Sequence, residues 1–268
     1  MRGGLWRGRR WRIGFVPVMG AMVAGILSLT AGGEVLAAEP LRVAVAPAFG
    51  FGAVGHDGRL TGFNVDIARA LCEEMAVPCD IAMQPFNQLM DRLAARRDLD
   101  FVVASVLRTP ERERAFLFTD RYWRSSSTFV ARTGEIQRPL IEAGAGKRVA
   151  TLAGSRQQAF LRDRMGERAS VAGYATDGDV LDAVRRGEAD MALMATISAL
   201  LLLSSEERHG LEFVGDPITE NGLGGDVAIA LPFGREALRD RVNQALRTIL
   251  LNGRYDAISS RYFPFRVY

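Results

Sequence analysis

The hydroxyl of Ser105 and the guanidinium of Arg112 follow a short run of apolar residues. The run, residues 101–104, is typical of a buried strand, and Thr109 stands three residues before Arg112. A guanidinium is a rigid, permanently charged fork that can bind a carboxylate through two parallel hydrogen bonds. The segment therefore indicates a carboxylate-binding site, although a lone arginine near a strand end can also be a solvated surface charge.

The segments before this site alternate between apolar strands and amphipathic helices. Strands are expected at 41–46, 77–83 and 99–104, with helices opening at 62–67 and spanning 86–97. This alternation predicts an α/β fold with a mainly parallel sheet that is covered by helices. Such sheets bind ligands at the carboxyl ends of their strands, where Phe49, Phe86 and the segment 105–112 should emerge.

A second α/β unit follows. A strand at 127–131 leaves the first lobe. A strand at 148–152 and a Gly154-Ser155 turn then lead into a helix that begins at 156. A strand at 227–231 returns to the first lobe. The chain should therefore cross between two lobes twice, as in a hinged clamp. The expected limits are 38–131 with 222–268 for the first lobe and 132–221 for the second.

The first 37 residues resemble a cleavable export signal. Five arginines precede an apolar stretch at 13–30, and small residues lead to an expected cleavage after Ala37, with Ala38 as the alternative. A retained membrane anchor and a twin-arginine signal are the other interpretations.

The chain has 34 basic and 31 acidic side chains, and five arginines but only one acid lie in the signal. The mature chain is thus nearly neutral, and its charge does not indicate nucleic-acid binding.

Two cysteines, Cys72 and Cys79, lie seven positions apart. An exported chain meets an oxidising compartment, where such a pair is expected to form a disulfide. Two free thiols are the alternative. A metal site would have too few ligands, because no histidine lies nearby. We expect neither a metal nor a cofactor.

The motifs resemble those of family 3 of the bacterial periplasmic solute-binding proteins, which are receptors of ABC importers. The resemblance rests on four features in order: Gly62-Phe-Asn-Val-Asp66, the Cys-x6-Cys pair, the Ser105 to Arg112 segment, and the ending at 253–268. The Cys-x6-Cys pair and the ending are most similar to those of lysine/arginine/ornithine- and histidine-binding proteins. The resemblance implies the two-lobe type II fold, a periplasmic location, a small anionic or zwitterionic solute and an inner-membrane ABC permease as partner.

The resemblance also implies the ligand site. In amino-acid-binding members, the ligand carboxylate meets the motif arginine, here Arg112, and backbone N–H groups at a second-lobe helix start, here Ser155 and Arg156. The start of a helix offers free N–H groups to an anion, although Ser155 can also act only as a helix cap. The motif Ser105 belongs to the site, and aromatic walls are expected from Phe86 and from Phe49 or Phe51, unless these rings pack only in the core.

Three positions depart from the pattern of the amino-acid receptors. Ala195 stands where an aspartate receives the ligand ammonium, Leu107 where a hydroxyl helps, and Arg156 where a threonine is usual. A buried ammonium without partners is costly, so an aromatic or aliphatic mono- or dicarboxylate is expected rather than an ordinary α-amino acid. Asp226 or Glu220 could replace the missing carboxylate.

Two other functions are open. Cyclohexadienyl dehydratases look like these receptors. If the protein were such an enzyme, Glu111 would be the nearest candidate for its general acid, although an ion pair is the more expected role for Glu111. The segment at 122–130 resembles part of receptor-like accessory proteins of periplasmic quinoprotein dehydrogenases. Transport without catalysis remains the expected function.

Overall fold

Two five-stranded sheets organise the chain in the computed structural model, which describes residues 39–95, 98–136, 146–204, 210–264 and 267–268. The expected export signal at 1–37 lies outside the described residues. Within them, no helix is both long and apolar enough to cross a bilayer.

In the first sheet, two parallel strand pairs are followed by two antiparallel pairs, so that one strand runs opposite to the other four. Its order is β4 (Cys79–Met83), β1 (Leu41–Val45), β5 (Phe101–Leu107), β12 (Gly225–Leu231) and β6 (Leu117–Ser125). Successive side chains of a strand point to opposite faces. Val43 and Val45 therefore pack in one apolar cluster, and Ala44 packs in another on the opposite face.

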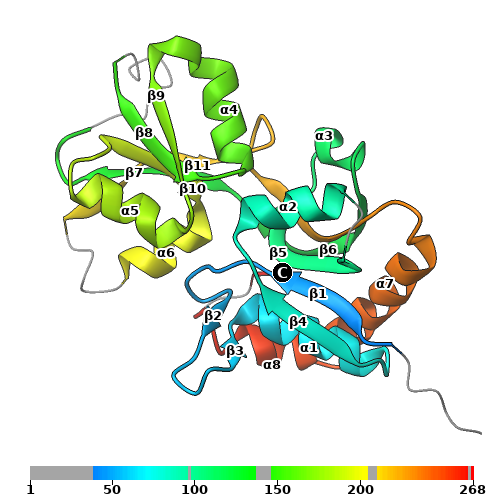
Figure 1. Cartoon of the computed structure of the whole chain (residues 1–268). Coiled ribbons are helices and arrows are strands. Elements are labelled where there is room, and N and C mark those ends of the chain that lie inside the picture. The colour runs from blue at the N-terminus through cyan, green and yellow to red at the C-terminus, as the bar shows by residue number, and fades with distance from the viewer. Residues whose placement is uncertain (1–38, 96–97, 137–145, 205–209, 265–266) are drawn as a thin grey trace, which may run out of the picture. The chain divides into compact units, whose positions relative to one another are not determined.

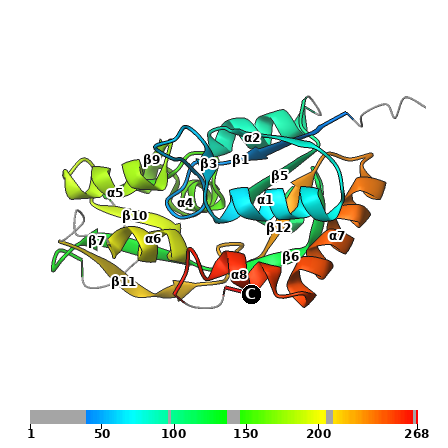
Figure 2. The ribbon, with the colours of Figure 1, turned by 90° about the horizontal axis from the view of Figure 1, so that it is seen from below.

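Helices cover both faces of this sheet (Figures 1 and 2). The cluster around Val43 receives side chains from α1 (Phe63–Glu74), α7 (Glu236–Leu251) and α8 (Arg254–Ser259). The cluster around Ala44 receives them from α2 (Phe86–Ala94). A short helix, α3 (Pro110–Glu113), follows β5, and a small hairpin of β2 (Ala53–Val54) and β3 (Leu60–Thr61) precedes α1.

The second sheet repeats the pattern of two parallel pairs followed by two antiparallel pairs. Its order is β9 (Ser170–Tyr174), β8 (Arg148–Leu152), β10 (Met191–Ala195), β7 (Ser127–Arg132) and β11 (Leu211–Ile218). One face is packed by α5 (Asp177–Arg185) and α6 (Thr196–Leu203), and the other by α4 (Arg156–Met165), which a 3₁₀ turn (Gly166–Arg168) follows. The predicted α/β fold class is confirmed.

One predicted strand belongs to a different sheet than expected. Residues 127–131 are expected in the first lobe, but β7 pairs with β10 and β11 of the second sheet. The chain therefore passes to the second sheet at Ser126, between β6 and β7, and returns between β11 and β12. At this crossing the Ser126 hydroxyl donates to Thr196 Oγ1 over 2.8 Å, and the Ser127 hydroxyl donates to the Leu223 carbonyl.

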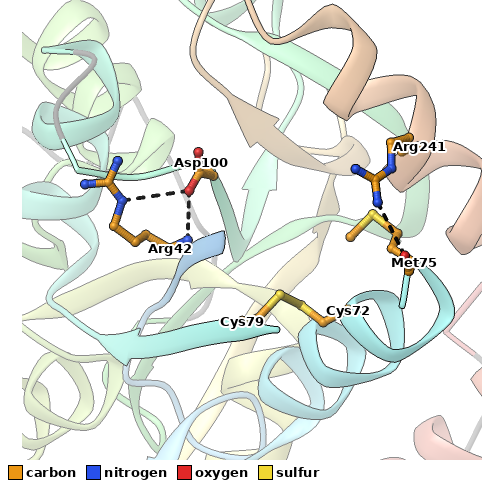
Figure 3. Close-up of a disulfide and its surroundings, with 6 residues drawn as sticks. All are labelled: Arg42, Cys72, Met75, Cys79, Asp100 and Arg241. Atoms are coloured by element: carbon orange, nitrogen blue, oxygen red, sulfur yellow. Dashed lines mark hydrogen bonds and ion pairs between the residues drawn. A yellow bond between two sulfur atoms is a disulfide. The ribbon is translucent and has the colours of Figure 1, made fainter. Parts of the chain in front are cut away.

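The predicted disulfide between Cys72 and Cys79 is present and joins α1 to the start of β4 (Figure 3). A second contact holds the same end of α1, because Arg241 of α7 donates to the Met75 carbonyl over 3.3 Å. The disulfide thus attaches α1 to β4, and the hydrogen bond attaches it to α7.

Candidate functional site

One cavity is lined by residues of both sheets and their helices. Eight of the nine predicted site residues line it: Phe51, Phe86, Ser105, Leu107, Arg112, Ser155, Arg156 and Ala195. The ninth, Phe49, does not line this cavity, and it is 54% exposed. The sequence left open which of Phe49 and Phe51 faces the site, and in the structure it is Phe51.

Arg112 is presented by α3, directly after β5. Thr109 caps this helix by accepting from the Arg112 backbone N–H, and Pro110 suits its first position. Arg112 Nη1 donates to the Leu107 carbonyl over 3.2 Å, and the guanidinium carbon lies 5.6 Å from the Phe86 ring centroid. In the described part of the chain, no carboxylate forms an ion pair with Arg112.

Burial and, to a lesser extent, the nearby Arg156 guanidinium lower the pKa of Arg112 to about 10, and Glu111 acts in the opposite direction. The guanidinium remains protonated at neutral pH. Because both burial and a like charge work against its charged form, an anion in the cavity would stabilise it.

Ser105 is held in a left-handed backbone conformation with φ of 54°. Its N–H donates to the Tyr122 hydroxyl over 3.0 Å, and its Oγ accepts from Asn64 Nδ2 over 3.1 Å. The Tyr122 hydroxyl donates in turn to Asn64 Oδ1 over 2.9 Å. Burial raises the pKa of Tyr122 to about 12, so its hydroxyl stays protonated.

Such a conformation is unusual for serine and persists only where neighbouring groups enforce it. The buried Asn64 and Tyr122 supply these bonds. The sequence analysis named Ser105 but neither Asn64 nor Tyr122 as a residue of the site. Asn64 lies in the Gly62 to Asp66 motif of the family resemblance, so its signal was present in the sequence, and Tyr122 lies in the segment at 122–130.

The start of α4 faces the same cavity from the second sheet. The Ser155 hydroxyl caps the helix by accepting from the Gln158 N–H over 3.1 Å. For the backbone N–H groups of Arg156 and Gln157, no acceptor is found among the described residues. Two amides at the positive end of the helix are therefore open to an anion.

Gly154 allows this helix start to approach the first sheet. Its φ is 74°, and a Cβ there would lie 2.9 Å from the Cβ of Asn87 in α2. A larger residue would therefore strain the backbone and collide with α2. The contact places α4 and α2 against each other at the edge of the cavity.

Phe51 and Trp123 form the aromatic part of the wall. Their rings stack with centroids 5.5 Å apart, and both side chains are only 2% exposed. Trp123 was not predicted as a ligand-site residue. Phe51 also contacts Phe63 and Phe263, so it belongs to the core and to the cavity at once.

Asp177 is a carboxylate of the cavity that the sequence analysis did not find. It is the first residue of α5, lines the cavity and is 6% exposed. Burial raises its pKa to about 6, and a hydrogen bond with Ser198 of α6 opposes that shift. Asp177 thus places a carboxylate of the second sheet in the cavity, which the expectation of a solute without an α-ammonium group did not include.

The other acidic candidates lie elsewhere. Asp226 is 3.1 Å from Arg124 Nε, and neither it nor Glu220 lines the cavity. Glu111 is 67% exposed, and its Oε2 lies 3.4 Å from Arg156 Nη1. Glu111 therefore forms an ion pair, the role that was expected for it. Among the described residues, no group of three or more histidine, cysteine, aspartate or glutamate side chains could hold a metal ion.

Comparison with known proteins agrees with this architecture. The profile of the bacterial extracellular solute-binding proteins, family 3, matches residues 41–265. The L-arginine-binding protein of Pseudomonas aeruginosa is 30% identical over 266 residues, which cover 94% of this chain and 98% of that protein. The histidine-binding periplasmic protein of Escherichia coli K12 is 26% identical, with 91% of this chain and 95% of that protein covered.

The fold has close structural counterparts. The arginine-, lysine-, histidine-binding protein ArtJ from Geobacillus stearothermophilus superimposes with a TM-score of 0.77 at 18% identity, covering 85% of this chain and 96% of that one. Profile, relatives and fold thus agree with the motifs, and the chain belongs to the bacterial extracellular solute-binding proteins, family 3.

Proposed function

We propose that the protein is the periplasmic receptor of an ABC importer and that it closes two lobes on a small solute that bears a carboxylate. The carboxylate would lie between the Arg112 guanidinium and the amides of Arg156 and Gln157. An inner-membrane permease would then receive the solute. The names of the relatives, which include periplasmic arginine- and histidine-binding proteins, support an exported receptor of this kind.

The observation that carries the proposal is the position of Arg112. It lines the cavity without an ion-pair partner among the described residues, and Arg156 and Gln157, whose amides are open, line the same cavity. A guanidinium matches a carboxylate in two parallel hydrogen bonds, and a helix start adds backbone donors. These donors come from different sheets, so a bound carboxylate would connect the two lobes.

We place the lobe limits at the two crossings of the chain. The first lobe would contain residues 38–125 and the segment from β12 onward, and the second lobe would contain β7 to β11. Ser126 and the segment between β11 and β12 would act as hinges, because the chain changes sheet there. Ion pairs such as Arg156–Glu111 would break when the lobes open.

The test is solute binding by Arg112 variants. Titration calorimetry of the mature protein against small carboxylates should give no detectable binding for Arg112→Ala. Arg112→Lys should restore little affinity, because a point charge lacks the two-pronged geometry. The expected loss is roughly 100-fold or more, as for removal of one partner of a buried charged hydrogen bond.

Arg114→Ala is the matched control, since Arg114 lies two positions further, is exposed and does not line this cavity. It should bind as the unchanged protein does. Equal affinity in the Arg112→Ala variant would refute the proposed carboxylate site.

The other two functions have less support. The relatives named above are binding proteins, and Glu111, the candidate general acid, does not line the cavity. The comparisons do not support a quinoprotein dehydrogenase as partner. In the segment at 122–130, the buried Trp123 lines the cavity, and the buried Tyr122 accepts a hydrogen bond from the Ser105 N–H. These contacts account for both aromatic residues without such a partner.

A further inference from the structure

We propose that helix α6 forms an apolar latch between the two lobes, and that this latch raises the affinity for every solute without contacting any of them. The latch consists of the Ile197 and Leu201 side chains and the loop at 47–52 of the first lobe. It would favour the closed arrangement of the lobes. The inference rests on the proposed function only in requiring two lobes that move, because it concerns how they close and not what they bind.

Helix α6 is apolar on nearly every side. Apart from Thr196 and Ser198, all of its residues are alanine, isoleucine or leucine. A helix of this composition is expected to be buried all round rather than on one face. The second sheet covers only part of it, through Ala199 and Leu202, which pack in the apolar cluster of that sheet.

The first lobe covers another face of α6. Ile197 and Leu201 are four positions apart, so they share one face of the helix. Both pack against the apolar cluster that contains Val43 and Phe51 of the first lobe. Separation of the lobes would expose both side chains to water, and the loss of apolar burial is unfavourable roughly in proportion to the area exposed.

The loop at 47–52 receives Leu201 at a glycine. Gly50 has a left-handed φ of 75°, and a Cβ there would lie 2.9 Å from Leu201 Cδ1. The Leu201 methyl group therefore lies directly against the backbone of Gly50, where a larger residue would crowd it. The loop is itself fixed to the first lobe, because the Gly50 carbonyl accepts from the Phe63 N–H over 2.9 Å at the start of α1.

The start of α6 is attached to one of the proposed hinges. The Thr196 N–H donates to the Ser126 carbonyl over 2.9 Å, and the Ser126 hydroxyl donates to Thr196 Oγ1 over 2.8 Å. Leu201 is five residues further along the helix, or about 7.5 Å at 1.5 Å per residue. A rotation about Ser126 would therefore move Leu201 away from Gly50 while the bonds of Thr196 remain.

The latch is separate from the cavity, since neither Ile197 nor Leu201 lines it. Arg156, which pairs with Glu111 of the first lobe, does line the cavity, so a change there would also affect a bound solute directly. A contact that acts only on closure changes the fraction of molecules that can close. It therefore changes the affinity for all solutes by one common factor.

The experiment measures binding and compactness for the same set of variants. The unchanged protein, Leu201→Ala, Leu201→Met and Leu200→Ala are titrated by calorimetry with the twenty common L-amino acids, glutarate and 3-phenylpropanoate. Leu200→Ala is the matched control, because Leu200 is the neighbouring residue of α6 and is 40% exposed. X-ray scattering gives the radius of gyration of each protein without a probe, and melting temperatures establish that each is folded.

We expect Leu201→Ala to bind every probe of the unchanged protein about 5- to 20-fold more weakly, by the same factor for each and with unchanged stoichiometry. The loss should appear as faster dissociation in stopped-flow measurements. Without a probe, the variant should have a larger radius of gyration than the unchanged protein. Leu201→Met, which keeps the volume and apolar character, should restore most of the affinity. Leu200→Ala should behave as the unchanged protein does.

Each contrary result has a definite meaning. Unchanged affinity or an unchanged radius of gyration in Leu201→Ala would overturn the latch. A loss that differs widely between probes would overturn it too, because it would indicate contact with the solute, and a lower stoichiometry at unchanged affinity would indicate damage to the fold instead. If the unchanged protein binds no probe, the proposed function fails, and the radius of gyration alone then decides whether the latch exists.

Discussion

The two walls of the cavity hold their polar groups in different ways. On the first sheet, Arg112 and Ser105 are fixed by side-chain and backbone bonds from Thr109, Leu107, Asn64 and Tyr122. On the second sheet, the open amides of α4 need no particular side chain, and Ser198 is the one hydrogen-bond partner of Asp177 among the described residues. The first wall is thus prepared in advance, whereas the second leaves donors and a charge for a solute to complete.

The difference suggests how a two-lobe receptor divides its work. A rigid first wall can bind the carboxylate in the open form. The unsatisfied groups of the second wall are stabilised by the solute when the lobes close. Closure is then favoured by the solute, because only the solute satisfies the second wall. Three predictions test this division.

The largest effect is expected at the aromatic part of the first wall. Trp123 is fully buried and stacked on Phe51, so Trp123→Ala should lower the free energy of unfolding by about 3–5 kcal/mol. Urea unfolding measures this change. Leu251→Ala is the control, because Leu251 is 88% exposed and should change stability by no more than about 0.5 kcal/mol. A small effect of Trp123→Ala would mean that the first wall is not rigid.

An intermediate effect with pH dependence is expected at Asp177 on the second wall. Its pKa is raised from 3.8 to about 6 by burial, so the native state binds the proton more tightly than the unfolded state does. Its contribution to stability is therefore greatest below pH 4, falls as pH rises from about 4 to about 6, and stays low above that. Arg112 and Arg156 line the same cavity, but neither is among the causes of this shift.

Asp177→Asn removes this titration. Without solute, the variant should be more stable than the unchanged protein at pH 8, by on the order of 1–3 kcal/mol, and should lose that advantage at pH 4. Urea unfolding at one-unit pH intervals gives the difference. A difference that is the same at every pH would show that Asp177 is not the strained group of the second wall.

The smallest effect is expected at Ser105. Glycine adopts the left-handed conformation without strain, so Ser105→Gly should stay within about 1 kcal/mol of the unchanged protein despite losing the bond from Asn64. A β-branched residue is unsuited to positive φ, and Ser105→Val should lose about 1–3 kcal/mol. If both variants were equally stable, the backbone at Ser105 would not be held as described.

The first wall was predictable because its residues form a local motif. Ser105, Thr109 and Arg112 lie within eight positions, and their types reveal the chemistry even without coordinates. Phe51 could not be separated from Phe49 in the same way. Both rings stand in one glycine-rich loop, and only the turn that packs Phe51 against Trp123 decides between them.

The second wall and its sheet were harder to read. The strands β9 and β11 were not predicted, because they lie at the sheet edges and are too exposed to show apolar alternation. An apolar run such as β7 does not reveal which sheet it joins. Asp177 has the pattern of an ordinary helix start, so only its burial against the cavity distinguishes it.

A crystal structure with the tightest-binding small carboxylate tests the central claim most directly. We expect the solute carboxylate within hydrogen-bonding distance of the Arg112 guanidinium and of the Arg156 and Gln157 amides. A solute bound in this cavity with its carboxylate away from Arg112 would contradict the account.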